Sequence, residues 1–359
     1  MVNADVLQGK RVLVTGGTGS LGSTLIRRLL QGDLGRPETI TIFSRDEAKQ
    51  HEMRLTLDKR AAATDEVVFD DWKHIVRFQI GDVADEASVR TALRETHVVF
   101  NAAALKQVPT CEYFPLQAVR TNILGPEQIV RAIRELGLPV ETVVGISTDK
   151  ACKPVNVMGM TKAIQERVFI QANLDCVPTR FVAARYGNVL ASRGSVIPLF
   201  HEQIRGGGPV TLTTPEMTRF LMTLDQAVDT VFAALREARP GEIYVPRVPS
   251  AKMTDLAAAL IDGRQIETVI TGIRPGEKVH EILVSEEEAY RTVSRDNYLA
   301  IKPMLPELDS ESEALGLPVD RPFSSADNLL DVDGVRAVLK RNELLVDQTA
   351  HRGLELMHA

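Results

Sequence analysis

Hydrophobic residues along this chain alternate between two spacings. Short runs rich in valine, isoleucine, phenylalanine and threonine recur at intervals, and each is typical of a buried strand. Longer stretches such as LGSTLIRRLL and QIVRAIRELG lie between them, with apolar residues that return every three or four positions, as on one face of a helix. The strand-like runs are residues 11–15, 39–43, 75–80, 97–102, 142–147 and 180–185. Alternating strands and helices predict an α/β fold with a doubly wound parallel sheet, covered by helices on both faces.

The pattern changes after Arg185. Segments such as GGGPVTLTTPEMTRF and PRVPSAKM are rich in loop residues, with one clear amphipathic helix, LDQAVDTVFAALREA, between them. We therefore expect a first domain over residues 1–185, a smaller lobe over 186–300 and a C-terminal extension over 301–359. We expect the helix at 221–238 to pack back on the first domain. Ligands of open α/β folds bind at the carboxyl edge of the sheet, so the lobe is predicted to lie over that edge and to bind substrate.

Composition narrows the class of protein. The 359 residues are 44% hydrophobic, which is enough for a large core. No apolar stretch reaches about 18 residues, and MVNADVLQGK lacks the order of a secretory signal, so we expect a soluble cytoplasmic protein with no membrane contact. The net charge of -6 argues against nucleic acid as a partner. Cys111, Cys152 and Cys176 have no C-x-x-C spacing, and the seven histidines have no metal-ligand spacing, so neither a disulfide framework nor a metal site is expected.

The motif TGGTGSLG, residues 15–22, lies between the first strand and the first helix. A glycine-rich turn in this position brings the pyrophosphate of a dinucleotide to backbone N–H groups at the helix N-terminus. Gly16, Gly19 and Gly22 supply the tight turn, the close approach and the packing of helix on strand. The motif predicts a dinucleotide site in a Rossmann-type fold, whose loop also contributes Thr18, Ser20 and Leu21.

The end of the second strand indicates which dinucleotide binds. An acidic residue there bonds the ribose of NAD, whereas an arginine accommodates the 2'-phosphate of NADP. Ser44 and Arg45, with Lys49, favour NADP, while Asp46 keeps NAD open; the alternative is that Arg45 is a solvated surface charge. After the third strand, Asp82 and its neighbour Val83 are placed to reach the adenine, although a Gly-Asp pair is also an ordinary turn.

Several motifs together resemble one family. TGGTGSLG, SRDEAKQ, GDV, NAAALKQVP, TNILG, STDKACKPVNVMGMTK, RYGNVLASRGSVIPLF, MTRFLMT and GIRPGEKVHE occur in the order seen in the nucleotide-sugar 4,6-dehydratases of the extended short-chain dehydrogenase/reductases. The chain is most similar to soluble UDP-N-acetylglucosamine 4,6-dehydratases of bacterial surface-glycan biosynthesis, over roughly residues 8–300. The resemblance implies a hydride taken by NADP from C4 of the sugar, loss of water across C5 and C6, and return of the hydride to C6. It also implies cofactor contacts from Ala103, Lys162 and Tyr186.

The resemblance assigns the acid and base to one short segment. Oxidation at C4 makes the C5 proton acidic, so elimination needs a base near C5 and an acid near the C6 oxygen. By resemblance Asp149 is the acid and Lys150 the base, and Thr148 orients the C4 hydroxyl. We expect the pKa of Asp149 to be raised and that of Lys150 to be lowered, the latter by desolvation and nearby positive charge. The alternative is an ordinary surface pair in a loop after a strand.

Met158 departs from the wider superfamily, in which a tyrosine four residues before Lys162 transfers the C4 proton. Positions 158 and 162 share a helix face, so Met158 is expected where the phenol would lie, and a thioether cannot transfer that proton. Lys162 is expected to bond the nicotinamide ribose. Either the site is inactive in redox chemistry, or Lys150 or Asp149 removes the C4 proton through water. The missing phenol argues against a simple 4-epimerase or alcohol dehydrogenase.

The substrate side needs donors for a diphosphate and a nucleotide. Arg219 and Arg274 offer fork-shaped donors for phosphate oxygens, and Glu277 an acceptor for ribose hydroxyls; the alternative for the arginines is a surface salt bridge. We interpret His280 as structural, and the resemblance puts Asn122 behind the active site. The remaining expected substrate contacts, by resemblance, are Lys106, Thr121, Met158, Asn188, Arg193, Ser195 and Val196.

Two hypotheses from other classes remain open at this level. One is a silent dinucleotide-binding sensor, which binds cofactor without turnover. The other is an interaction module whose acidic tail after residue 300 docks a partner, although that tail could equally pack on its own lobe. GDP-N-acetylglucosamine is an alternative substrate. A homo-oligomer is expected by resemblance, because related enzymes pair through the long helices that flank the sheet.

Overall fold

A computed structural model describes residues 5–63, 72–190, 195–308 and 316–349. Its main feature is a ten-stranded sheet in the order β15-β13-β14-β9-β6-β5-β4-β1-β2-β3. Every neighbouring pair from β3 across to β9 is parallel. The parallel strands are β1 (Arg11–Thr15), β2 (Thr39–Ser44), β3 (Val76–Ile80), β4 (Val98–Asn101), β5 (Thr142–Thr148), β6 (Arg180–Tyr186) and β9 (Ile243–Pro246). The structure confirms the predicted α/β fold with a Rossmann-type sheet.

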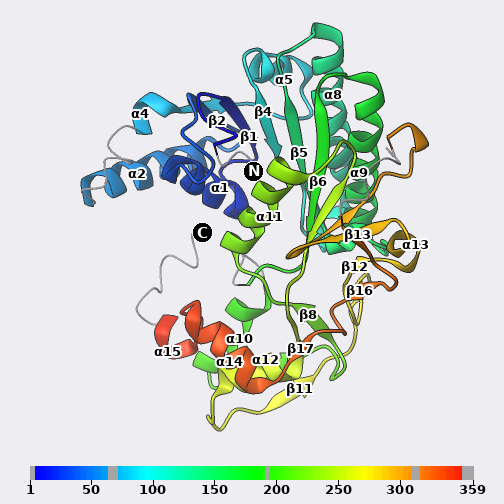
Figure 1. The fold of residues 1–359 in the computed structure, drawn as a ribbon. Helices are drawn as coiled ribbons and strands as arrows, with labels where there is room; N and C mark the ends of the chain where they lie inside the picture. The colour runs from blue at the N-terminus through cyan, green and yellow to red at the C-terminus, as the bar shows by residue number, and fades with distance from the viewer. Residues whose placement is uncertain (1–4, 64–71, 191–194, 309–315, 350–359) are drawn as a thin grey trace.

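Helices cover both faces of this sheet (Figure 1). On one face α1 (Ser20–Gln31) packs against α11 (Leu224–Glu237), which also contacts β5, β6 and β9. On the other face α5 (Glu86–Leu93), α8 (Gly125–Leu136) and α9 (Val157–Asp175) pack side by side. The remaining helices of this part are α2 (Glu47–Ala63), α4 (Trp72–Ile75), α6 (Val108–Tyr113), α7 (Pro115–Val119), the π-helical turn η1 (Arg120–Leu124) and the 3-10 turn η2 (Asp149–Ala151). Two apolar cores, one on each face, hold the helices to the strands.

The later part of the chain returns to the sheet. Antiparallel to β9 lies β14 (Tyr298–Ile301), followed by β13 (Thr292–Arg295) and the two-residue β15 (Leu317–Pro318). Residues 186–300 and 301–359 therefore both contribute strands to the main sheet. The domain boundaries expected after residues 185 and 300 do not coincide with the edge of this sheet. These strands have two to four residues, which is too short for a clear alternating pattern.

A smaller lobe lies over the carboxyl edge of the sheet (Figure 1). It has its own apolar core, and the C-terminal segment packs into it. In this segment β16 pairs with β12, β17 pairs with β10, and α14 packs on α12, so the described tail residues contact the protein's own lobe. The lobe and tail comprise α10 (Val196–Arg205), β7 (Val210–Leu212), β8 (Thr218–Phe220), β10 (Ser250–Lys252), α12 (Met253–Ile261), β11 (Thr268–Ile270), β12 (Ile282–Val284), α13 (Glu286–Ala289), η3 (Pro306–Leu308), β16 (Phe323–Ser324), β17 (Leu329–Leu330), α14 (Val332–Arg341) and α15 (Val346–Thr349).

The described helices include none that is both long enough and apolar enough to span a bilayer.

Candidate active site

The glycine loop after β1 forms a cradle that side chains would fill. Gly16 has a φ of +64°, and a Cβ there would lie 2.7 Å from the backbone nitrogen of Ala103. A Cβ on Gly22 would lie 2.6 Å from the Gly16 carbonyl oxygen. Gly19 caps α1 without a side-chain hydrogen bond, and the first turn has no acidic residue, so its N–H groups are open to an anion. The loop, which includes the half-buried Thr18, Ser20 and Leu21, therefore fits a dinucleotide pyrophosphate.

Charged residues at the ends of β2 and β3 are paired with one another. Arg45 is 57% exposed, and its guanidinium lies 3.3 Å from Asp82. Lys49 pairs with Asp46 at 3.2 Å. Ser44 is buried against Gln50, and Val83 lies in the core next to the site. Arg45 and Asp82 were expected to contact different parts of a cofactor, and in this structure they pair with each other.

Thr148, Asp149 and Lys150 lie together at the carboxyl end of β5. Asp149 is 1% exposed; its Oδ1 accepts a hydrogen bond from Thr148 Oγ1 at 2.7 Å and lies 3.2 Å from Lys150 Nζ. Asp149 Oδ2 is buried and has no hydrogen-bond partner in the described part of the chain. Lys150 Nζ also lies 3.3 Å from Glu281 Oε1. A buried acid with one free oxygen beside a lysine is suited to proton transfer.

The pKa of Lys150 differs from the sequence expectation. Burial disfavours the ammonium, but the carboxylates of Asp149 and Glu281 outweigh this effect, and the pKa is raised although Arg219 acts in the opposite direction. The expected lowering of the Lys150 pKa is therefore wrong. The sequence could not show that a carboxylate from a distant segment lies against this lysine.

Lys162 lies buried on α9, with Nζ donating to Gln165 Oε1 at 2.6 Å. Desolvation lowers its pKa to about 8, although Glu166 acts in the opposite direction. Gln165 in turn donates to the Ile146 carbonyl on β5, which ties this part of α9 to the strand that carries Asp149. Tyr186, at the end of β6, is buried, and burial raises the pKa of its phenol.

Met158 lies in a small apolar cluster rather than in the polar site. It is 5% exposed and packs with Cys111 and Ala118. The side chain of Asn122 accepts a hydrogen bond from the Leu105 N–H and donates to the Leu105 carbonyl and to the Thr161 hydroxyl. It thereby joins the loop after β4 to α9. Thr121 is buried in η1, and Lys106 is exposed in the loop after β4.

Six of the predicted substrate residues line one cavity of about 800 Å³ in the lobe. They are Asn188, Ser195, Val196, Arg219, Arg274 and Glu277. Polar side-chain atoms of three of them, Asn188 Oδ1, Ser195 Oγ and Glu277 Oε2, are buried with no hydrogen-bond partner among the described residues. Ser195 is the N-cap residue of α10, whose first turn has no acidic residue. The cavity therefore offers arginines, a helix N-terminus and the Ser195 hydroxyl to an anionic group, and the acceptors Asn188 Oδ1 and Glu277 Oε2 to hydroxyl groups of a ligand. Arg193 lies outside the described residues.

Glu281 joins this cavity to the Asp149–Lys150 pair. Its Oε1 lies 3.8 Å from Arg219 Nε and 3.3 Å from Lys150 Nζ. Sequence reasoning missed Glu281, although it is the last residue of the quoted stretch GIRPGEKVHE. Only its position in the structure, beside both Arg219 and Lys150, identifies Glu281 as part of the candidate site.

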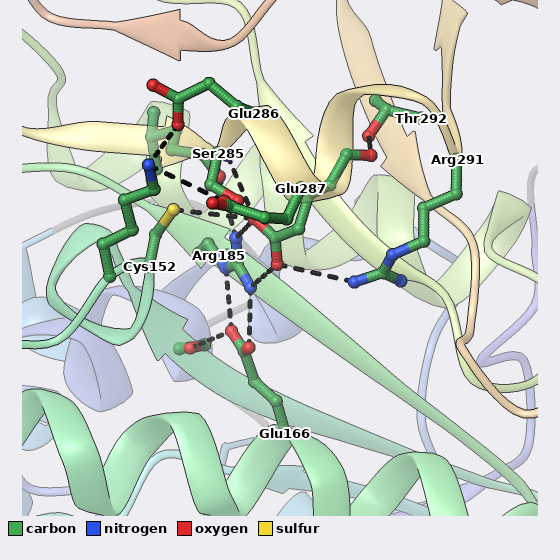
Figure 2. Close-up of polar contacts among 12 residues, drawn as sticks. Cys152, Glu166, Arg185, Ser285, Glu286, Glu287, Arg291 and Thr292 are labelled. Atoms are coloured by element: carbon green, nitrogen blue, oxygen red, sulfur yellow. Dashed lines mark hydrogen bonds and ion pairs between the residues drawn. The ribbon is translucent and has the colours of Figure 1, made fainter.

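A buried ion network lies behind the site (Figure 2). Arg185, on β6, is 1% exposed and makes two hydrogen bonds to Glu166 of α9, at 2.9 and 2.7 Å. It makes two more to Glu288 of α13, at 2.7 and 2.8 Å. Ser147 donates to Glu166, and the Cys152 thiol lies 3.5 Å from Glu288. The network was not predicted; the spacing of Glu166 four residues after Lys162 was its available signal, because both then lie on one face of α9.

The chain matches one protein family and is similar to proteins that are named as enzymes of nucleotide sugars. The sequence model described as "Polysaccharide biosynthesis protein" matches residues 12–303. A protein named UDP-N-acetylglucosamine 4,6-dehydratase (inverting), from Campylobacter jejuni, is 39% identical over 311 residues, which are 86% of this chain and 87% of the relative. A protein named UDP-glucose 4-epimerase, from Rickettsia akari, is 42% identical over 297 residues, 81% of this chain and 82% of the relative.

Solved structures agree with the fold. The X-ray structure of Pen from Bacillus thuringiensis superposes with a TM-score of 0.82 at 30% identity, covering 95% of this chain and 100% of that chain. Three further structures that hold NAD or NADH have TM-scores of 0.58 to 0.63 at 20 to 24% identity, and their likeness concerns the fold alone.

Proposed function

Since the chain belongs to the polysaccharide biosynthesis protein family, as an extended short-chain dehydrogenase/reductase of the nucleotide-sugar dehydratase type, we propose that it is a UDP-N-acetylglucosamine 4,6-dehydratase. The product is the UDP-4-keto-6-deoxy sugar, made in the cytoplasm for bacterial surface glycans. The observation that carries the proposal is the buried Asp149 beside Lys150 at the end of β5, a pair that Glu281 links to Arg219 of the cavity. Elimination of water needs such a pair, whereas transfer of a hydride alone does not.

The cofactor of this proposal is a nicotinamide dinucleotide, and we propose NADP. When bound, this group would supply the hydride transfer from C4 and back to C6. Gly16 and Gly22 leave room for its pyrophosphate, and the N–H groups at the start of α1 bind the phosphate oxygens. Lys162 bonds the nicotinamide ribose, and its pKa of about 8 keeps most of its charge at neutral pH.

The reacting sugar lies between β5 and the cavity. Arg219 and Arg274 hold the diphosphate, Glu277 the ribose, and Asn188 a phosphate oxygen. Thr148, which bonds Asp149, orients the C4 hydroxyl. Because Met158 cannot take the proton of that hydroxyl, the proton leaves through water to Asp149, or to Lys150, which must then release it to solvent before it acts as the base at C5. Asp149 then gives a proton to the departing C6 oxygen, while Lys150 takes the C5 proton.

A second candidate is 4-epimerisation, because a relative that is 42% identical is named UDP-glucose 4-epimerase. Epimerisation inverts C4 and keeps the C6 hydroxyl, so it does not need an acid at C6. The buried acid Asp149, with a free oxygen, favours dehydration.

Proton NMR of the purified chain with UDP-N-acetylglucosamine, without added cofactor and in deuterated buffer, tests the proposal. A new C6 methyl signal supports dehydration with a cofactor that is recycled in the site. A change at C4 with C6 intact supports the epimerase. An unchanged spectrum, repeated with added NADP and with GDP-N-acetylglucosamine, refutes both and favours the silent sensor.

Arg45 decides between NADP and NAD in this proposal. Arg45→Ala is expected to weaken binding of NADP, but not of NAD, by about 10- to 100-fold, because a charged hydrogen bond to the 2'-phosphate contributes about 1.5–3 kcal/mol. Titration calorimetry with each dinucleotide measures the two dissociation constants. Lys73→Ala, which removes an exposed cation paired with Asp58, serves as the control. An equal loss of affinity for both dinucleotides would contradict the assignment.

We propose that two copies of the chain pair through α8 and α9, as in the enzymes that the sequence resembles. Of these two helices, α9 also packs against α6 and α7, and this part of the surface carries exposed apolar side chains. They are Tyr113, Phe114, Leu116, Leu124, Met160 and Ile164. Met160 and Ile164 lie one turn apart on the same side of α9. Light scattering of the wild type is expected to give the mass of an oligomer and that of Ile164→Asp the mass of one chain; a monomeric wild type would overturn this.

A further inference from the structure

Glu281 lies between the substrate cavity and the Asp149–Lys150 pair, just before β12. Its side chain is only 3% exposed. Oε1 faces both Lys150 and Arg219, while Oε2 is buried with no hydrogen-bond partner in the part of the chain that the structure describes. A buried carboxylate with an unsatisfied oxygen costs free energy, so its presence calls for an explanation other than stability.

The Lys150 ammonium is shared almost equally between two carboxylates. Its Nζ lies 3.2 Å from Asp149 Oδ1 and 3.3 Å from Glu281 Oε1. Without Glu281, the ammonium would be attracted by Asp149 alone, and this attraction grows as the charges approach in a medium of low dielectric constant. Lys150 already donates a hydrogen bond to Asp149 Oδ1, and without Glu281 this carboxylate would be the one that fixes the ammonium. A lysine held by the acid alone is poorly placed to take a proton from a different atom of the sugar.

Ser325 holds Glu281 in place from the C-terminal extension. The Glu281 backbone N–H donates to Ser325 Oγ at 2.9 Å, and the Ser325 N–H donates to the Glu281 carbonyl at 2.8 Å. Ser325 is fully buried, and its hydroxyl lies 2.7 Å from that of Thr218, the residue before Arg219. Ser325 thus links Thr218, which precedes Arg219 of the cavity, to Glu281, whose carboxylate lies beside Lys150. It lies beyond residues 12–303, which the family model matches.

We propose that Glu281 is a positioning residue that gives the Lys150 ammonium a second carboxylate contact, so that Lys150 is not held by Asp149 alone, and that Ser325 sets the place of this carboxylate. The inference rests on the proposed dehydration, in which Asp149 and Lys150 act as separate groups. It gives the C-terminal extension a part in the active site.

The proposal predicts a change in protonation. The charged groups that act on Lys150 are the carboxylates of Asp149 and Glu281, the guanidinium of Arg219 and the ammonium of Lys278. Removing the charge of Glu281 alone leaves one anion among the cations, so the pKa of Lys150 falls. A base must be deprotonated to act, so the acid limb of the kcat/KM profile moves to lower pH. A merely structural role for Glu281 would not move this limb.

The test uses the full chain with 13C-labelled lysine and follows the pH titration of Lys150 by NMR. Its resonance is assigned by its loss in Lys150→Arg. In Glu281→Gln, which keeps the shape of the side chain, we expect the Lys150 pKa to fall by about one unit or more. We also expect kcat on the pH plateau to fall by about tenfold, with KM changed less than about twofold, since substrate binding is retained. In Ser325→Ala the pKa is expected to fall by less, because the charge stays but is no longer fixed.

Glu242→Gln is the matched control. Glu242 is 2% exposed and pairs with Arg295 at 2.6 Å at the start of β9, away from the site. This variant is expected to leave the Lys150 pKa unchanged. An unchanged Lys150 pKa in Glu281→Gln overturns the inference. A wild-type chain that forms no C6 methyl refutes the dehydratase instead, and the titration still decides whether Glu281 acts on Lys150.

Discussion

Asp149→Asn is expected to lower kcat for formation of the C6 methyl by about 10²- to 10⁴-fold, the usual contribution of general acid catalysis. The amide keeps an oxygen that accepts from Thr148, so the fold of the segment is retained. It has no acidic proton to give to the departing C6 oxygen. Because oxidation at C4 precedes elimination, the variant is also expected to accumulate reduced cofactor, which absorbance measurements detect.

The control for this prediction is Asp175→Asn. Asp175 is exposed at the end of α9 and pairs with Arg134 on the far side of the fold from the sugar site. Its replacement is expected to leave kcat unchanged. A rate close to that of the wild type in Asp149→Asn would mean that another group protonates the leaving oxygen.

Arg185→Met is expected to destabilise the protein by about 3–5 kcal/mol, because it leaves the buried carboxylate of Glu166 without its cation and that of Glu288 with Arg291 alone, 3.7 Å away. Arg185 joins β6, α9 and α13 behind the active site, so activity is expected to fall with stability (Figure 2). Chemical denaturation measures the free energy of unfolding. Arg131→Met, which removes an exposed arginine paired with Glu135 on α8, is expected to have little effect. Equal stability of the two variants would contradict the argument.

The pH dependence of stability gives a second measurement on the same network. Burial acts to raise the pKa of Glu288, but Arg185 outweighs it and lowers the pKa to about 2 from an ordinary value of 4.5. A carboxyl whose pKa is lowered by folding stabilises the protein above its unfolded pKa, and this stabilisation is lost as pH falls through the folded pKa. The wild type is therefore expected to lose stability between about pH 4.5 and pH 2. In Arg185→Met this loss is expected to be smaller.

Local sequence features predicted the dinucleotide part of the fold well. The alternation of strands and helices, and the glycine loop between β1 and α1, depend on neighbours in the chain. The six substrate residues that line the cavity were found through motifs, and the structure brings them together. Their roles, like those of Asp149 and Lys150, stay predictions until the site is tested.

Features that depend on distant contacts were missed. Strands β9 and β14 join the main sheet through pairing partners far along the chain, and β13 follows as the antiparallel neighbour of β14. Their few residues carry no periodic signal. The pKa of Lys150 was expected to fall, but Glu281 from another segment raises it. Burial of Arg185 between two carboxylates likewise depends on three elements that are separate in sequence.

The late position of Ser325 has a consequence for how the protein is made. Domains fold as units while the ribosome delivers the chain at about 5–20 residues per second. Strands β1 to β6 leave the ribosome first, so β6 has an unpaired edge until β9 has been synthesised. Glu281 lacks its hydrogen bond to Ser325 until that later residue has been synthesised as well. For a time on the order of 10 s the nascent chain can have its dinucleotide cradle without a finished acid and base. If the proposed dehydration holds, the cofactor can then bind before the acid and base are in place, and a chain cut short before Ser325 would stay in that condition.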